Sequence, residues 1–122
     1  YVMYDKLNEI GFYNLSKELW EFCWEDTSIL MKDFRGKEIA KQMIRSCGSI
    51  SANIEEGFGR GFGKEYPQFL RIARGSARET KGWYQRSKNI LSIKIIEERT
   101  NLLDNIISMI TKTISTLENK NK

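Results

Sequence analysis

The chain has no histidine, one proline and two cysteines in 122 residues, and each scarcity excludes some classes of protein. Without histidine, Ser-His-Asp catalysis, Cys-His catalysis and histidine-ligated zinc are excluded. The single proline, together with abundant isoleucine, leucine, lysine and glutamate, favours helices. We therefore expect an all-α protein that is not an enzyme and that holds neither a cofactor nor a metal.

Long hydrophobic runs are also missing from the sequence. Each apolar run is a few residues long, far short of the roughly 20 residues that span a bilayer, and the first residues carry no secretory pattern. These features predict a single cytoplasmic domain without membrane contact. Cys23 and Cys47 lie on segments expected to form separate helices, which favours buried, reduced thiols over the alternative of a disulfide.

Apolar residues recur with helical spacing in four segments, at about residues 5–30, 36–58, 64–91 and 96–118. Glycines at 57, 59, 61 and 63 end the second segment. Pro67 fits the first turn of the third segment, where its missing N–H has no helical partner. Short turns between the segments predict one domain, residues 1–122, folded as an antiparallel up-down-up-down four-helix bundle.

The apolar positions also predict which side chains meet inside the bundle. In the third segment the predicted core face is Tyr66, Phe69, Ala73, Ala77, Thr80, Tyr84 and Leu91. The last segment carries a seam, Leu103, Ile107, Ile110, Ile114 and Leu117, and beside it a second row, Leu102, Ile106 and Met109. One seam suffices inside a bundle, so the second row indicates a face that packs on another subunit. Trp20 and Trp24, one turn apart, are expected to pack in the bundle or in a subunit contact.

Two neighbouring stretches combine glycine and small residues with helical spacing. Ser49 to Gly61 reads SISANIEEGFGRG, and Lys64 to Trp83 reads KEYPQFLRIARGSARETKGW. Together they closely resemble the four helix bundle protein family, first described as proteins encoded by intervening sequences in bacterial large-subunit ribosomal RNA genes. The matching positions are Ser49, Ile50, Ala52, Asn53, Ile54, Glu56, Gly57, Gly59, Arg60, Lys64, Glu65, Ala73, Arg74, Gly75, Ser76, Glu79, Thr80 and Trp83. The resemblance implies no catalytic role for any of them.

The resemblance implies small antiparallel bundles that assemble into a ring-like homopentamer around a central channel. Relatives of the family include the accessory variability determinant of diversity-generating retroelements, a basic pentameric barrel that binds a reverse transcriptase and nucleic acid. The partners it leads us to expect are further copies of the chain, nucleic acid, and a reverse transcriptase or another protein.

A set of polar and small residues is interpreted as a structural motif: Asn53, Glu56, Gly57, Gly59, Arg60, Gly75, Ser76 and Glu79. Because a charge held between helices needs a partner, we expect Glu56 or Glu79 to pair with Arg60 or Arg74 in a network that joins the second and third helices. Close helix approach is expected at the helical glycines 48, 75 and 82, because it would offset their cost of about 1 kcal/mol relative to alanine.

Positive charge is concentrated in the third helix and the turn after it. From Lys64 to Lys94, eight basic residues stand against two acidic ones, a net charge of +6, whereas the whole chain carries +4. At about 100° per residue, six basic side chains project from one side: Lys64, Arg71, Arg74, Arg78, Lys81 and Lys88. Repeated around an oligomer, this stripe predicts salt-dependent contact with nucleic-acid phosphates, and the alternative is an ordinary solvated surface. Tyr66, Trp83, Tyr84 and Phe62 are near enough to stack on bases, but most of them fit core or interface positions better.

Two functions are expected from these patterns. The first is a non-enzymatic, oligomeric accessory protein that binds nucleic acid, foremost RNA, through the basic third helix and supports a reverse transcriptase. The second is a protein-protein adaptor, a scaffold ring that docks a protein partner through the same basic surface without binding nucleic acid.

Overall fold

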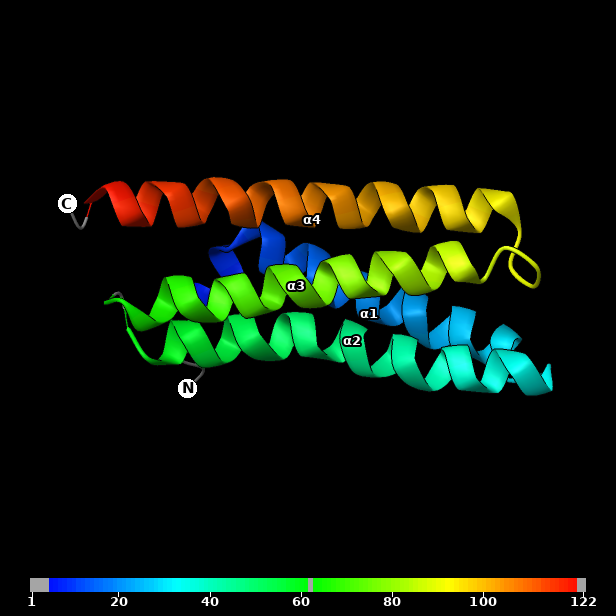
Figure 1. Cartoon of the computed structure of the whole chain (residues 1–122). Helices are drawn as coiled ribbons and strands as arrows, with labels where there is room; N and C mark the ends of the chain where they lie inside the picture. Colours follow the sequence, from blue (N-terminus) through cyan, green and yellow to red (C-terminus); the bar gives the residue numbers. More distant parts are fainter. Residues whose placement is uncertain (1–4, 62, 121–122) are drawn as a thin grey trace.

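The computed structural model describes residues 5–61 and 63–120. Over these residues the chain forms a short 3-10 helix, η1 (Lys6–Glu9), and the long helices α1 (Gly11–Leu30), α2 (Phe34–Gly59), α3 (Glu65–Arg86) and α4 (Ile93–Lys120). The long helices alternate in direction and form an up-down bundle (Figure 1). The prediction of an all-α, up-down four-helix bundle is confirmed.

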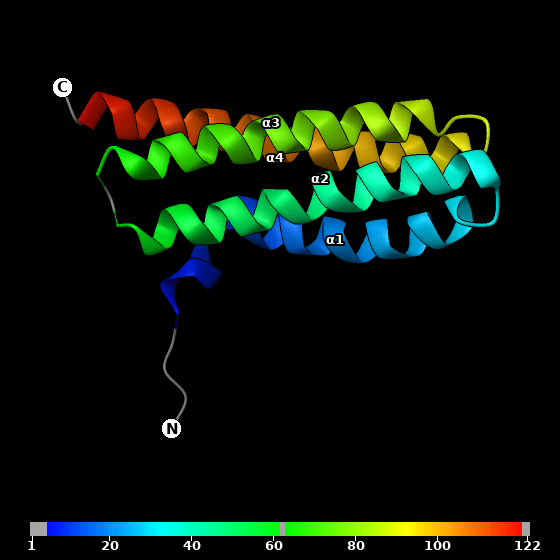
Figure 2. The same ribbon diagram turned by 60° about the horizontal axis from the view of Figure 1, so that its bottom comes forward.

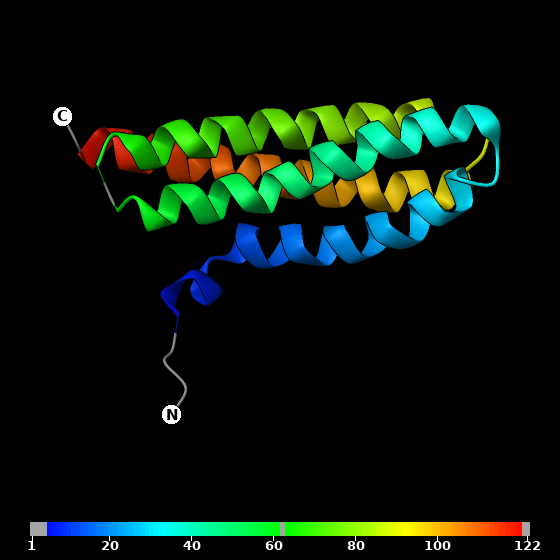
Figure 3. The same ribbon diagram turned by 90° about the horizontal axis from the view of Figure 1, so that it is seen from below.

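The helices pack in a cyclic order. α2 lies against α1 and α3, and α4 lies against α3 and α1, so that α1 and α3 occupy opposite corners (Figure 2). η1 sits beside the beginning of α1, at the edge of the bundle (Figure 3). The α1–α2 and α3–α4 turns meet at one end of the bundle, which we call the turn end and define as residues 31–37 and 86–94 (Figure 1).

The helix ends follow from local hydrogen-bonding chemistry. The Asp33 carboxylate accepts hydrogen bonds from the backbone N–H groups of Arg35 (2.8 Å) and Gly36 (3.1 Å), which caps α2 and lowers the pKa of Asp33. After α2, Gly61 has φ +89°, a left-handed conformation that glycine adopts without strain. Pro67 is the third residue of α3, where a helical N–H would lack an acceptor.

The core contains apolar side chains from every long helix. Leu19, Met43, Leu70 and Leu103 are completely buried. Of the predicted core face on the third helix, Tyr66, Ala73, Ala77, Thr80, Tyr84 and Leu91 are buried and Phe69 is half-buried. This burial is the main source of the bundle's stability.

Two helix boundaries differ from the sequence prediction. The first helix is interrupted at Ile10, whose extended backbone (ψ 114°) separates η1 from α1. The third helix ends at Arg86 instead of 91: the Ser87 N–H donates to the Tyr84 carbonyl three residues back (3.0 Å), and residues 87–90 form a turn whose Ser87 carbonyl accepts from the N–H groups of Ile90 and Leu91. Lys88 therefore lies in the α3–α4 turn and not on the helix.

The second apolar row of the last helix does not require another subunit, contrary to the sequence prediction. Ile106 is completely buried within the bundle itself, and Leu102 packs half-buried against the same core. Met109 reaches α1, where its Cε lies 2.8 Å from the position of a Cβ built on Gly11. Because α4 packs on both α1 and α3, it needs two adjacent apolar rows within one chain.

Close approach is found at some helical glycines and is absent at others. A Cβ built on Gly57 would lie 2.6 Å from the Phe69 Cβ, and one built on Gly48 would lie 3.1 Å from the Trp20 ring. At Gly75 no atom lies within 4 Å, and at Gly82 the neighbour is the flexible end of Arg86. The expectation of close helix approach is therefore wrong for Gly75 and Gly82.

Cys23 and Cys47 are free thiols, both completely buried. A hydrogen bond with Cys23, together with burial, raises the pKa of the Cys47 thiol. Within residues 5–61 and 63–120, no helix has the length and apolarity needed to cross a bilayer.

Candidate nucleic-acid interface

The basic residues of α3 lie on the flank that faces α4. Lys64 is the residue before the first turn of α3, and Arg71, Arg74, Arg78 and Lys81 follow along the helix. Lys64 and Arg78 are exposed, whereas the other three are partly covered by α4. Lys64, Arg71 and Arg78 are spaced seven residues apart, as are Arg74 and Lys81, so they form two rows with a repeat of about 10.5 Å.

Three of these cations contact α4. Arg71 pairs with Glu118, the Lys81 ammonium lies 2.7 Å from the Asp104 carboxylate, and the Arg74 guanidinium donates to the Thr111 hydroxyl (3.1 Å). The Lys81 side chain is 30% exposed and the Asp104 side chain 53%, so water reaches this pair. Within the described residues, Lys64 and Arg78 have no ion-pair partner. The flank is therefore positive but partly neutralised by α4.

The predicted structural motif is held together by hydroxyl groups along the two helices and by exposed ion pairs of Arg60 where α2 ends and α3 begins. Glu56 does pair with Arg60 (2.8 Å), but one turn away on α2, and both side chains are half exposed. Glu79 accepts from the Trp83 indole (3.0 Å) on its own helix. Arg60 also lies 3.8 Å from Glu65, the first residue of α3, so the expected charge network is present in part: it joins the end of α2 to the start of α3 and does not include Glu79 or Arg74.

Hydroxyl contacts connect α2 to α3 along the rest of their length. The Ser76 hydroxyl donates to Ser49 (3.0 Å), and the Thr80 hydroxyl donates to Ser46 (2.8 Å). The Asn53 amide donates to the backbone carbonyl and the hydroxyl of Ser49, one turn away. Because hydroxyl groups are small, these contacts let the two helix backbones lie close together.

A buried charged cluster, missed from the sequence, lies between α1, α3 and α4. The Asp26 carboxylate accepts hydrogen bonds from Tyr84 (2.6 Å) and from Arg99 (2.8 Å and 3.3 Å). The Arg99 guanidinium also stacks on the Phe22 ring, 4.0 Å from its centroid. The sequence signal was an aspartate and an arginine at apolar-face positions of otherwise amphipathic helices.

Burial and neighbouring charge shift the pKa values in this cluster. Burial raises the pKa of the Tyr84 hydroxyl, and the hydrogen bond to Asp26 adds to this shift. Burial opposes the charge of Arg99, but its contacts with Asp26 outweigh that cost and raise the pKa of Arg99. The polar atoms satisfy one another inside the core, an arrangement that fits a structural role.

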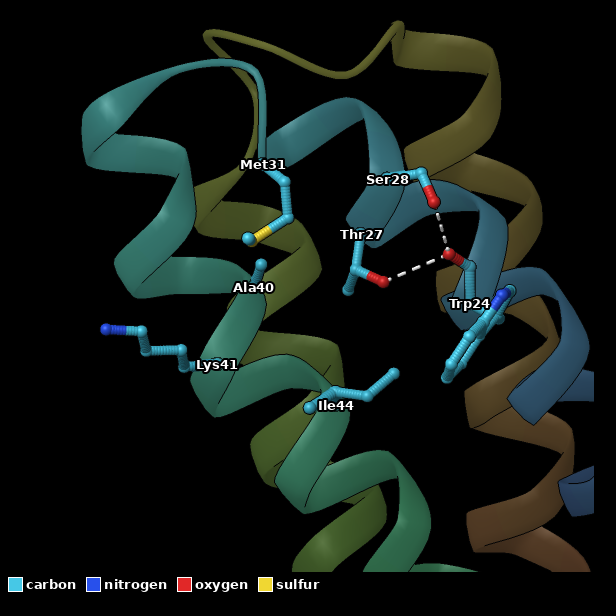
Figure 4. A pocket seen from close by; sticks show the side chains of 7 residues that line it. All are labelled: Trp24, Thr27, Ser28, Met31, Ala40, Lys41 and Ile44. Carbon is cyan, nitrogen blue, oxygen red and sulfur yellow. Dashed lines mark hydrogen bonds between the residues drawn. The ribbon is translucent and has the colours of Figure 1, made fainter.

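A groove between α1 and α2 lies on the side of the bundle opposite the α3–α4 flank. One hollow of about 240 Å³ is lined mostly by apolar side chains, including Trp24, Met31 and Ile44, whereas Lys41 points away from it (Figure 4). A second hollow of about 360 Å³ lies along the same two helices at Trp20 and Gly48. Trp20 packs against the core, but Trp24 is 61% exposed.

The aromatic candidates for base stacking are mostly enclosed. Tyr66 and Tyr84 are buried, and Trp83 is half-buried with Arg86 over its ring. Phe62 lies outside the described residues. Phe34, which the sequence analysis did not single out, is 78% exposed. No cluster of three or more cysteine, aspartate or glutamate side chains suited to a metal is present among residues 5–61 and 63–120.

Comparisons with known proteins agree with this architecture. A solved structure described as a protein of unknown function from the S23 ribosomal protein family of Bacteroides thetaiotaomicron is similar, with a TM-score of 0.76. The alignment covers 84% of this chain and 97% of that chain at 24% sequence identity, which shows the fold alone. No curated protein matches the chain. Residues 8–114 match the family described as 23S rRNA-intervening sequence protein, and because this match covers most of the chain, the protein belongs to that family.

Proposed function

We propose that the protein is a non-enzymatic, oligomeric accessory protein that binds RNA through the α3–α4 flank. The observation that carries this proposal is the pair of cationic rows on α3, with Lys64 and Arg78 exposed and unpaired among the described residues. Such rows suit contacts with backbone phosphates, which give affinity without sequence readout. The family description refers to ribosomal RNA, which favours RNA as the nucleic acid.

The oligomer is proposed to be a ring-like homopentamer. Its support is a surface that is incomplete in the isolated chain: an apolar groove with an exposed Trp24 between α1 and α2. The outer face of α1 is acidic, with Glu18, Glu21 and Glu25 exposed, while the diagonally opposite α3 is basic. We place the subunit contact on the α1–α2 side, where the apolar groove lies, so that the basic α3–α4 flank on the opposite side stays free for RNA.

The RNA proposal is tested by neutralising four cations of the flank, Lys64, Arg71, Arg78 and Lys81, with glutamine. Glutamine is preferred to glutamate because an acidic residue at 71 or 81 would face Glu118 or Asp104 and weaken the fold. We expect the variant to keep the oligomeric mass of the wild type and to lose retention on RNA at moderate salt. Anisotropy of labelled RNA and light scattering measure the two properties.

A matched control replaces four cations of η1, α1 and α2, namely Lys6, Lys17, Lys41 and Arg45, with glutamine. This control has the same net charge as the test variant and should retain RNA. An equal loss of RNA retention in both variants would mean that the total charge of the protein, and not the position of the charges on the flank, governs binding. Absence of wild-type retention even at low salt would reject the proposed function.

The carboxylates of α4 provide a second test of the same surface. Asp104 and Glu118 compete with phosphates for Lys81 and Arg71, so replacing them with Asn and Gln should tighten RNA binding. The plot of log affinity against log salt should steepen by about 1.4 to 1.8, the value for two additional phosphate contacts. Glu18→Gln with Glu25→Gln on α1 adds the same charge far from the flank and should leave the slope unchanged. A weaker or unchanged affinity in the α4 variant would remove the flank from the interface.

The second candidate function is a protein-protein adaptor, with a reverse transcriptase as one candidate partner. The α1–α2 groove favours it, because exposed apolar surface of this kind is typical of protein contacts. Nuclease treatment before co-purification separates the two functions. An acidic protein that remains bound after nuclease treatment, without nucleic acid, would favour the adaptor.

A further inference from the structure

The turn end carries more net positive charge than the whole chain. Its 16 residues, 31–37 and 86–94, include six basic residues and one acidic residue, a net charge of +5, compared with +4 for the complete sequence. The basic residues are Lys32, Arg35, Lys37, Arg86, Lys88 and Lys94, and all six are exposed. The rest of the chain therefore has a net charge of −1. This concentration arises from the fold, because the two segments are about fifty residues apart in sequence.

The single acidic residue of the turn end does not cancel this charge. The Asp33 carboxylate already accepts the N-terminal N–H groups of α2, and its ion-pair partner is Arg35 at 3.6 Å. Among the described residues, no carboxylate pairs with the other five cations. Five uncompensated cations on one small surface attract a polyanion.

Exposed apolar side chains lie among these cations. Phe34 is 78% exposed, Ile93 is 69% exposed and Met31 is 46% exposed. The Arg35 guanidinium lies 5.7 Å from the centroid of the Phe34 ring. An exposed aromatic ring beside a guanidinium is a surface on which a nucleobase stacks, irrespective of its sequence.

A hollow lined in part by Asp33 and Arg35, the sequence neighbours of Phe34, adds hydrogen-bonding groups to the turn end. It has a volume of about 410 Å³ and is lined by Asp33, Arg35, Ile39, Arg86, Asn89 and Ile90, so it joins the start of α2 to the α3–α4 turn. Volumes of about 300 Å³ and above accept small ligands. Two guanidinium groups and one amide supply donors for a base edge or a phosphate, while the isoleucines supply apolar contact.

We infer that the turn end binds a single-stranded segment of nucleic acid, with an unpaired base stacked on Phe34 and its neighbours held by Arg35, Arg86 and Lys88. The inference rests on the proposed function and specifies its ligand. Duplex bases are stacked on one another and do not reach the ring, so the site selects unpaired nucleotides. A second copy of the turn end is a less suitable partner, because two surfaces of charge +5 repel each other. A bilayer surface is also less suitable, because it would not fill the polar hollow.

The test compares Phe34→Ala with the wild type on two fluorescein-labelled probes, a single-stranded RNA of about 12 nucleotides and a blunt RNA duplex of the same length. Loss of one stacked base should weaken single-strand binding about 5- to 150-fold and change duplex binding less than about twofold. Phe34→Trp, which keeps the stacking surface, should bind the single strand as the wild type does. Ile72→Ala, which removes an exposed apolar side chain (52%) from the middle of α3, is the matched control and should change neither affinity.

The guanidinium groups of Arg35 and Arg86, which line the hollow, allow an independent test of the same site. Arg35→Gln with Arg86→Gln should reduce the single-strand salt slope by about 1.4, because two phosphate contacts are lost. If the wild type binds the single strand and Phe34→Ala binds it equally well, the inference is wrong while the proposed function stands. If the wild type binds neither probe at low salt, the proposed function itself fails. Loss of binding to anionic phosphatidylserine vesicles, or of the oligomeric mass, in Phe34→Ala without loss of RNA binding would also overturn the inference.

Discussion

Replacing Asp26 with alanine is expected to destabilise the bundle by about 3–5 kcal/mol. The Asp26 side chain is 2% exposed and the Arg99 side chain 10%, so neither group is solvated by water in the native state. Removing the carboxylate leaves the buried guanidinium with only the half-exposed Glu98 as counter-charge, 3.4 Å away, and leaves the Tyr84 hydroxyl without its acceptor. Urea unfolding followed by circular dichroism, at one fixed protein concentration, measures the loss.

The Glu56–Arg60 pair is the matched control for that measurement. Its two atoms are 2.8 Å apart, as close as those of Asp26 and Arg99, but both side chains are about half exposed. Solvent screens such a pair, so Glu56→Ala should leave the unfolding midpoint near that of the wild type. If Asp26→Ala and Glu56→Ala unfold at similar urea concentrations, then burial does not determine how much an ion pair contributes to the free energy of unfolding, and the argument fails.

A double variant separates charge from packing at the same site. Asp26→Leu with Arg99→Met replaces both charges with apolar groups, and it should recover most of the stability lost in Asp26→Ala. Such recovery would show that the charged cluster is not required for stability. Its role would then be to fix the alignment of α1 against α4. Tyr84 would still need a partner for its hydroxyl, so a small residual loss is expected.

The helices were predictable because each one buries a single stripe whose period is visible in the sequence. Positions such as Leu19, Met43 and Leu103 recur every three or four residues and are completely buried in the structure. The break at Ile10 and the early end of α3 at Arg86 were not predictable, because single hydrogen bonds in turns decide them. Lys88 was consequently assigned to a helix face that it does not occupy.

The surroundings of the basic stripe depend on contacts between helices that the sequence does not specify directly. Asp104, Thr111 and Glu118 are seven residues apart on α4, and they face Lys81, Arg74 and Arg71 on the antiparallel α3. The seven-residue spacing is shared by Asp104 and Thr111 with Lys81 and Arg74, and this part of the pattern was available from the sequence, whereas Arg71 is only three residues from Arg74. The turn end was also within reach of the sequence, because the first and third turns of an up-down-up-down bundle lie at the same end, but assigning Lys88 to a helix face hid the shared charge of the two turns.

The packing around glycines is also not specified directly by the sequence. A sequence shows that a glycine interrupts a helix but not which atoms lie over its Cα. Gly36 lies beside the α1–α2 turn, where an added Cβ would be 2.1 Å from the Leu30 carbonyl oxygen and 3.0 Å from the Ile90 Cδ1. Gly75 lies on the exposed side of α3 with no atom within 4 Å. An added methyl group therefore clashes with the backbone at Gly36 and meets open space at Gly75.

The same substitution should have opposite effects at these two glycines. Gly36→Ala forces a backbone carbonyl to move and opens the turn, with an expected loss of about 2–3 kcal/mol. Gly75→Ala meets open space and restricts the unfolded chain, with an expected gain of about 0.5–1 kcal/mol. Both changes replace a helical glycine with alanine, so a large difference between their urea midpoints reports mainly the clash at Gly36. A destabilised Gly75→Ala that also loses oligomeric mass would place a second subunit over the exposed side of α3, where the isolated chain leaves room for one.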